Sequence, residues 1–131
     1  MDHLFVYGTL RRGSDHEIAR LLQGQARFVG DARMHGRLYG LGRYPGAVAA
    51  VRPGAVAAVR KDEWVRGEVY QMDDSAGLMA VLDDYEGSGF ERAISSVQLD
   101  DGKAIECWVY LYVGKTPGKL IESGDWLAKP G

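Results

Sequence analysis

The chain has few of the residues that build covalent or metal-bound frameworks. It contains one cysteine, Cys107, which excludes an intrachain disulfide and any metal site made of several cysteines, and which fits a reducing compartment. Its three histidines, His3, His16 and His35, have no spacing typical of zinc ligands, so we expect no metal. Stability must therefore come from an apolar core.

Long apolar runs and clustered charge are also absent. No run approaches the roughly 18 to 20 apolar residues of a membrane-spanning helix, and Met1-Asp2-His3 opens the chain without the basic and apolar regions of a signal peptide. We expect a cytoplasmic protein that binds no membrane. With 16 basic and 18 acidic residues and no basic run beyond Arg11-Arg12, we expect a small-molecule partner and no nucleic acid.

What is present fits a small mixed fold. A length of 131 residues with 46% apolar content predicts one domain, 1–131, with a single core, and 18 glycines with several β-rich runs favour an α+β fold dominated by strands. Asp100-Asp101-Gly102 predicts a hairpin turn, and residues 40–46 a glycine-rich loop. The expected strands are 3–7, 26–29, 33–39, 65–71, 92–99 and 104–113, and the expected helices are 14–22 and 74 or 75 to 86.

The late strand places Cys107 on an apolar face. Residues 105, 107, 109, 111 and 113 are apolar and alternate with Glu106, Trp108, Tyr110 and Tyr112, which is the period of a half-buried strand. Nothing nearby in the sequence would favour a thiolate, so we interpret Cys107 as a core residue.

The stretch Leu4 to Gly13 runs from an apolar strand into a turn of small residues. Gly8 permits close backbone approach and a positive φ, and a capping box starting at Ser14 predicts that a helix N-terminus follows. Such a turn can present backbone N–H groups to a small anion, and the side chains of Arg11 and Arg12 are the first candidates for binding that anion. An ordinary strand end is the alternative.

Three carboxylates lie in the last turn of the second expected helix, at Asp83, Asp84 and Glu86. This position is unfavourable for carboxylates because it is the negative end of the helix dipole. Carboxylates crowded there should have a raised proton affinity. The apolar stripe predicted for this helix is Leu78, Val81, Leu82 and Tyr85. The spacing predicts that Gly87 turns the chain so that Glu86 points inward while the two aspartates stay solvated; a solvated acidic cap is the alternative.

Residues 45–52 are repeated without change at 53–60. An even offset preserves which side chains of a strand face the core, so the two copies can compete for one pairing register. A tolerated surface hairpin or loop is the simpler interpretation. Strand exchange between two subunits of a homodimer is a further one.

Four motifs in order and spacing resemble the gamma-glutamylcyclotransferase-like family. They are Tyr-Gly-Thr-Leu-Arg at 7–11, Gly-Glu-Val-Tyr at 67–70, Leu-Asp-Asp-Tyr-Glu-Gly at 82–87 and Trp-Val-Tyr at 108–110. The ending 121–126 is similar to that of small bacterial members and of gamma-glutamylamine cyclotransferase. The resemblance covers nearly the whole chain.

The resemblance implies a small mixed β-barrel flanked by short helices, with a cavity at one barrel end. It also implies a reaction without cofactor, in which the α-amine of a γ-glutamyl group attacks its own γ-carbonyl, forms 5-oxoproline and expels an amine or amino acid. Glu86 matches the catalytic glutamate and would act as base and then acid. Backbone amides of the turn would hold the substrate, and the two tyrosines would wall the pocket or bond the substrate, unless they are ordinary packed tyrosines. These expected substrate-binding residues are Tyr7, Gly8, Thr9, Leu10 and Tyr110.

One position departs from the family pattern. Phe90 stands where a tyrosine is usual, so the hydroxyl is missing, while Arg92 matches the family arginine and is expected to brace the helix–strand junction. A non-catalytic protein that binds a small carboxylate metabolite on the same fold is therefore the alternative function. The sequence does not identify the amine that is released.

Overall fold

A computed structural model describes residues 2–8, 10–11, 17–42, 44–49, 63–73, 75–113 and 118–126. In chain order the elements are β1 (His3–Val6), α1 (Glu17–Gln25), β2 (Ala26–Gly40), β3 (Pro45–Ala49), β4 (Trp64–Met72), α2 (Ser75–Glu86), the short 3₁₀ helix η1 (Gly87–Gly89), β5 (Phe90–Leu99), β6 (Ala104–Tyr112) and β7 (Lys119–Leu120). Among the described residues, no helix is long and apolar enough to cross a membrane.

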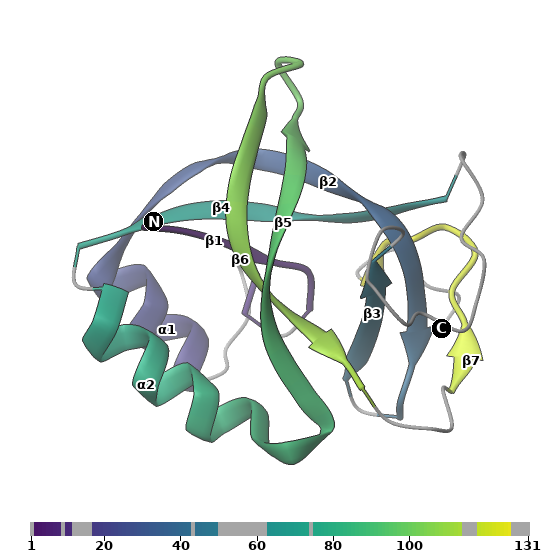
Figure 1. Ribbon diagram of the computed structural model, residues 1–131, viewed down its shortest axis with the longest axis horizontal. Coiled ribbons are helices and arrows are strands. Elements are labelled where there is room, and N and C mark those ends of the chain that lie inside the picture. Colours follow the sequence, from purple (N-terminus) through teal and green to yellow (C-terminus); the bar gives the residue numbers. More distant parts are fainter. Residues whose placement is uncertain are drawn as a thin grey trace.

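Five strands close into a barrel in the order β2, β4, β1, β6, β5, because β5 pairs back onto β2. The β1–β6 pairing is parallel and the other pairings are antiparallel, so the barrel is mixed. Figure 1 shows α1 and α2 together on one side of the barrel, with β3 and β7 beside the far end of β2. The α+β fold with a small mixed barrel and short helices is confirmed.

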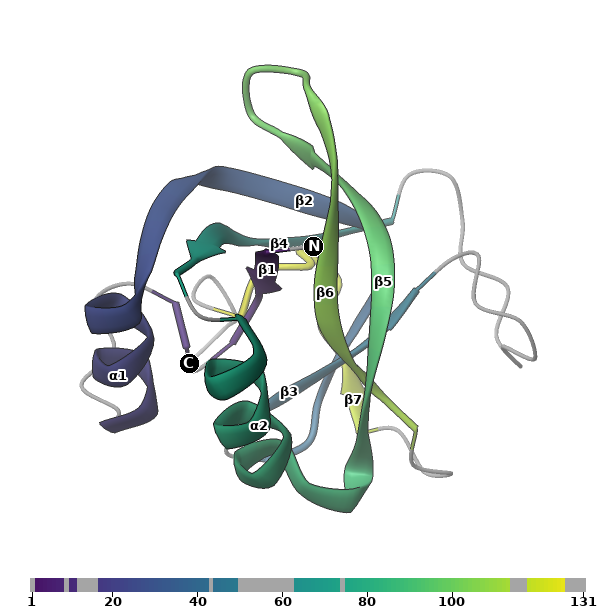
Figure 2. The ribbon, with the colours of Figure 1, turned by 60° about the vertical axis from the view of Figure 1, so that its left-hand side comes forward.

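The long strand β2 corrects one prediction. The sequence indicated two extended segments broken at Gly30, but pairing with β4 continues through this region, with an irregularity between Phe28 and Gly30. A bulge of this kind absorbs an extra residue and bends the strand without ending it. Strand β2 curves over the barrel, pairing first with β4, from Ala26 to His35, and then with β3, from Gly36 to Gly40 (Figures 1 and 2).

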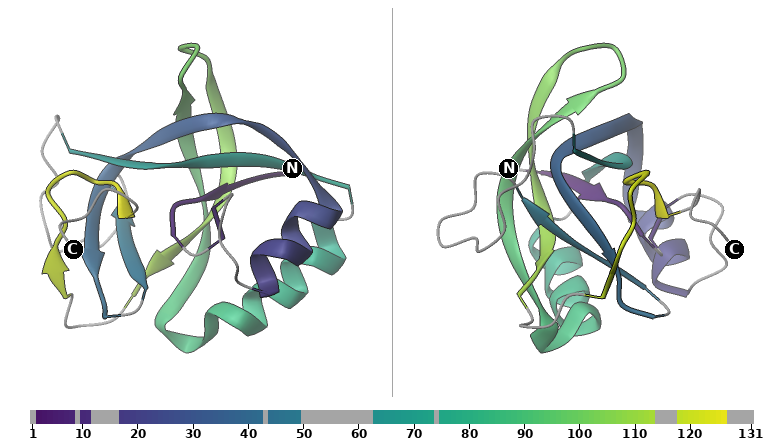
Figure 3. Two further views of the ribbon diagram at one scale, coloured as in Figure 1. Left: turned by 180° about the vertical axis from the view of Figure 1, so that it is seen from behind. Right: turned by 90° about the vertical axis from the view of Figure 1, so that its right-hand side faces the viewer.

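Alternating strand faces divide the buried residues into two clusters. Phe5, Val69 and Val109 belong to the cluster inside the barrel, and Leu4 and Tyr70 belong to a second cluster that packs against the helices. The two helices lie side by side against this second cluster, as the view from behind shows (Figure 3). Each strand of this wall therefore contributes one face to the barrel interior and the other to the helices.

Two burial predictions need correction in part. Cys107 is fully buried as predicted, and the other face of β6 is exposed at Glu106 and partly exposed at Trp108, but Tyr110 on that face is buried in the cluster that packs against the helices. In α2, Leu78 and Leu82 are buried as predicted. Val81 is 41% exposed, and Met79 is buried instead.

Other boundaries differ by a few residues. Helix α1 ends at Gln25, beyond the predicted end at residue 22, and the capping box at 14–16 lies outside the described residues. The hairpin turn between β5 and β6 forms as predicted, with a positive φ of 94° at Gly102. Strand β3 is formed by residues 45–49 of the first copy of the repeat, and the rest of the first copy and the whole second copy, 50–60, lie outside the described part of the chain.

Candidate active site

A cavity of about 260 Å³ opens between the turn after β1, the end of α2, and the starts of β3 and β5. It lies where the barrel core and the helix-covered cluster meet, since its wall takes residues from both. The structure brings five of the six predicted site residues to this wall. They are Tyr7, Gly8, Leu10, Glu86 and Tyr110; Thr9 lies outside the described residues.

The turn after β1 sits close against β3. The backbone N–H of Arg11 donates to the carbonyl oxygen of Gly8 at 3.1 Å. A Cβ on Gly8 would lie 2.6 Å from Cγ of Pro45, so a side chain there would push the turn away from β3. Gly8 does not use the positive φ that glycine permits. Glycine is required here by close approach, as the sequence also indicated.

Tyr7, which directly follows β1, is hydrogen-bonded to both β6 and β3 at the cavity wall. Its hydroxyl donates to the carbonyl oxygen of Tyr110 at 2.6 Å and accepts the backbone N–H of Ala47 at 3.2 Å. Burial raises the pKa of Tyr7 well above its ordinary value, and the nearby Glu86 also raises it. The hydroxyl therefore stays neutral and bonded to the protein, and Tyr7 contributes its ring to the cavity wall.

Tyr110 is held by the helix that carries Glu86. Its hydroxyl donates to Oδ1 of Asp83 at 2.6 Å, and burial followed by this bond raises the pKa of Tyr110 above its ordinary range. The other oxygen of Asp83 lies 3.5 Å from Nη2 of Arg92, whose guanidinium lies over the ring of Trp108. These contacts fasten the last turn of α2 to β5 and β6.

The sequence did not predict this role for Asp83, which was expected to be merely solvated. Asp83 and Tyr110 are 27 residues apart and meet only through the packing of α2 on β6, so no local pattern indicates the contact. Arg92, in contrast, braces the helix–strand junction in the way that was expected, through its ion pair with Asp83.

Glu86 ends α2 and lines the cavity. The next residue, Gly87, has a positive φ of 74°, the backbone conformation expected where the chain leaves the helix. Burial raises the pKa of Glu86 from an ordinary value near 4.5 to about 7. The cause is burial, whereas the sequence argument had relied on crowded acids and the helix dipole. A carboxyl group with this pKa can both accept and return a proton near neutral pH.

Phe90 lines the same cavity and belongs to a small aromatic group. Its ring centroid lies 6.0 Å from that of Tyr44 and 5.8 Å from that of Tyr112. Tyr44 is 48% exposed and also lines the cavity. The position where a hydroxyl was expected is therefore part of an apolar aromatic surface.

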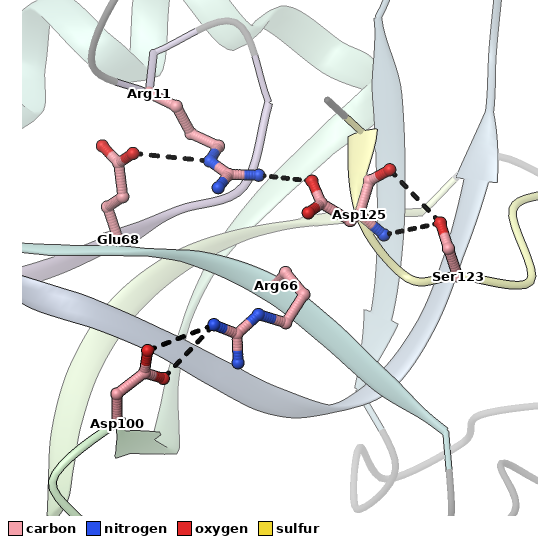
Figure 4. Close-up of polar contacts among 6 residues, drawn as sticks. All are labelled: Arg11, Arg66, Glu68, Asp100, Ser123 and Asp125. Carbon is pink, nitrogen blue, oxygen red and sulfur yellow. Dashed lines mark hydrogen bonds and ion pairs between the residues drawn. The ribbon is translucent and has the colours of Figure 1, made fainter. Parts of the chain in front are cut away.

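Arg11 is engaged inside the protein, as Figure 4 shows. Its Nη1 donates to Oδ1 of Asp125 at 2.7 Å, and its Nε lies 3.5 Å from Oε2 of Glu68, which is only 3% exposed and accepts a bond from the Tyr70 hydroxyl. Asp125 in turn donates its backbone N–H to Oγ of Ser123. Arg11 thus anchors the turn to β4 and to the C-terminal segment.

Within the described residues, no group of three or more histidine, cysteine, aspartate or glutamate side chains could hold a metal ion. Among the described residues, the ionisable groups of the cavity wall are Glu86 and tyrosines, and the Glu86 carboxyl, with a pKa of about 7, suits proton transfer near neutral pH.

Comparison with known proteins points to one family. The family model described as gamma-glutamyl cyclotransferase, AIG2-like matches residues 4–128. The chain is 39% identical over 128 residues to the gamma-glutamylcyclotransferase family protein YtfP of Escherichia coli K12, covering 95% of each chain. It is 29% identical over 141 residues to gamma-glutamylaminecyclotransferase of Rattus norvegicus, covering 99% of this chain and 86% of the rat protein.

A solved structure agrees with this assignment. An AIG2-like protein from Mus musculus superposes with a TM-score of 0.66 at 29% identity, covering 99% of this chain and 84% of the mouse chain.

Proposed function

The chain belongs to the gamma-glutamyl cyclotransferase, AIG2-like family, and from this premise we propose that it converts a γ-glutamyl amine or γ-glutamyl amino acid to 5-oxoproline, with Glu86 as general base and acid. The observation that carries the proposal is a half-buried carboxyl group with a pKa of about 7 on the wall of a cavity that faces the turn after β1.

The reaction moves two protons from the α-nitrogen to the leaving nitrogen. The carboxylate of Glu86 takes the first proton from the α-ammonium group, the free amine attacks the γ-carbonyl carbon to form the ring C–N bond, and Glu86 gives this proton to the amide nitrogen as the original C–N bond breaks. The second excess proton of the ring nitrogen passes through the freed carboxylate to the released amine, which leaves as an ammonium ion. A single carboxyl group with a pKa near the working pH can serve both steps.

The turn after β1 supplies the second element of the proposal. Backbone N–H groups of Gly8, Thr9 and Leu10 would bind the α-carboxylate and the developing oxyanion, because fixed amides stabilise such charge without reorganising. The rings of Tyr7 and Tyr110 would enclose the folded γ-glutamyl group, so that amine and carbonyl stay close. Their hydroxyls take part through the protein bonds that hold the wall in place.

The test is release of 5-oxoproline from a panel of γ-glutamyl amines and γ-glutamyl amino acids, followed by chromatography. We expect Glu86→Gln to lower kcat/KM at least 100-fold, which is the usual range for loss of a general base. Asp84→Asn is the matched control, because Asp84 is an exposed acid in the same helical turn and does not line the cavity. Equal activity of Glu86→Gln and wild type would remove Glu86 from the mechanism.

The alternative is a binding protein on the same fold. Thermal stabilisation by 5-oxoproline or by γ-glutamyl compounds, together with no turnover of any panel member by the wild type, would favour it.

A further inference from the structure

Resting on the proposed function, we propose that the amine released by this protein carries an apolar, uncharged substituent that packs on an aromatic rim formed by Tyr44 and Phe90. The substrate class is thus narrowed to γ-glutamyl amides of apolar amines, in preference to γ-glutamyl amino acids. The geometry of the cavity carries this inference in three steps.

The first step is the gradient of burial along the cavity wall. Leu10, Tyr110 and Tyr7 are 4%, 5% and 7% exposed, whereas Tyr44 is 48% exposed. Cyclisation requires an enclosed, folded γ-glutamyl group, and the released amine must leave toward solvent. The buried part therefore suits the γ-glutamyl group, and the rim suits the substituent on the leaving nitrogen.

The second step is the chemistry of that rim. The ring of Phe90 contacts the rings of Tyr44 and Tyr112, with interplanar angles of 57° and 64°. Pro45 adds a rigid apolar ring to the same wall and is itself packed against Gly8. A partly exposed tyrosine ring in contact with a phenylalanine ring offers apolar surface that an aryl or alkyl group on the substrate can cover.

The third step is charge. Among the described residues that line the cavity, Glu86 is the carboxylate and none is lysine, arginine or histidine. A leaving amino acid would bring its own carboxylate into this space, where ionised Glu86 repels it and no described lining residue offers a cation. An apolar amine brings no such charge.

Three substrates that share the γ-glutamyl group separate these effects. γ-Glutamyl-phenethylamide and γ-glutamyl-phenylalanine differ by one carboxylate on the leaving group, and γ-glutamyl-methylamide lacks the aryl ring. We expect kcat/KM for the phenethylamide to exceed that for each of the other two by about tenfold, the size of one good aromatic contact or one unfavourable charge pair.

Substitution at the rim completes the test. Tyr44→Ala should reduce the preference for phenethylamide over methylamide by about tenfold. Ile94→Ala should leave that preference unchanged, since Ile94 is 53% exposed and does not line the cavity. Equal or faster turnover of γ-glutamyl-phenylalanine, or an unchanged preference in Tyr44→Ala, overturns the substrate class while leaving the proposed function intact. No 5-oxoproline from any of the three substrates overturns both.

Discussion

Glu86→Gln is expected to make the protein more stable above neutral pH while lowering its kcat/KM at least 100-fold. In the folded state burial raises the pKa of Glu86 from about 4.5 to about 7, so the folded protein binds this proton more tightly than the unfolded chain does. The stabilisation from the bound proton is complete below pH 4.5. It is lost as the pH rises through 7, because the buried carboxyl must then ionise.

The magnitude follows from the two pKa values. Each tenfold difference in proton affinity corresponds to 1.36 kcal/mol, so the interval from about 4.5 to about 7 corresponds to about 3 kcal/mol of unfolding free energy. Glutamine has nearly the shape of the protonated side chain and never ionises. The variant should therefore gain up to about 3 kcal/mol relative to wild type between pH 4.5 and pH 8.5.

Urea unfolding of the two proteins at half-unit pH steps measures this difference, because all other titrating groups are shared and cancel. Asp84→Asn, which removes an exposed carboxyl from the same helical turn, is the matched control. A difference curve for Glu86→Gln that does not change with pH would refute the assignment of a half-buried carboxyl with a raised pKa. In the wild type, kcat/KM should rise with pH through about 7, since the base must be ionised.

Three further predictions concern stability, each measured by urea unfolding. Arg11→Met should cost about 3 kcal/mol because it leaves a buried carboxylate without its cation, whereas Arg66→Met, which breaks an exposed pair, should cost less than about 1 kcal/mol (Figure 4). Tyr110→Phe should cost about 1 kcal/mol through loss of its bond to the end of α2. Gly46→Ala places a Cβ 2.7 Å from a leucine side chain, and should cost about 1 to 3 kcal/mol in a chain lacking residues 53–60. In the full chain the cost should be smaller if residues 53–60 can pair with β2 in place of residues 45–52.

The contradicting outcomes differ for each. Equal losses for the two arginine variants would mean that the pair at Arg11 is solvated in solution. No loss in Tyr110→Phe would mean that water replaces the hydroxyl at Asp83 without cost. Equal losses for Gly46→Ala in both chain lengths would exclude competition between the two copies of the repeat.

Local patterns in the sequence predicted the parts of the fold and cavity wall that depend on neighbouring residues. The end of α2 is one example: Gly87 after Glu86 predicted the helix exit, and Glu86 lines the cavity, where a solvated acidic cap had been the alternative. The hairpin turn at Gly102 is another. That Glu86 carries out catalysis stays a prediction, as does substrate binding by the turn after β1.

Contacts between distant segments could not be predicted in the same way. Tyr110 meets Asp83 only once β6 is in register and α2 has docked on it, and Arg11 meets Asp125 across 114 residues of sequence. The break predicted at Gly30 failed for a related reason. Glycine in a strand can mark an end or a bulge, and the pairing of β2 with β4 on both sides of Gly30, from Ala26 to His35, shows the bulge.

The three acids at the end of α2 show how one unfavourable pattern is divided among different environments. Asp83 accepts a hydrogen bond from the Tyr110 hydroxyl and pairs with Arg92. Asp84 is exposed, and Glu86 is half-buried on the cavity wall with a raised pKa. Local rules are often broken where function requires it. Neutralising Asp83 and neutralising Glu86 should therefore change the free energy of unfolding at pH 8 in opposite directions. We expect a loss of about 1 kcal/mol for Asp83→Asn and a gain for Glu86→Gln. Changes of the same sign in urea unfolding would show that the helix dipole, and not the separate surroundings of each carboxylate, determines the energy of this turn.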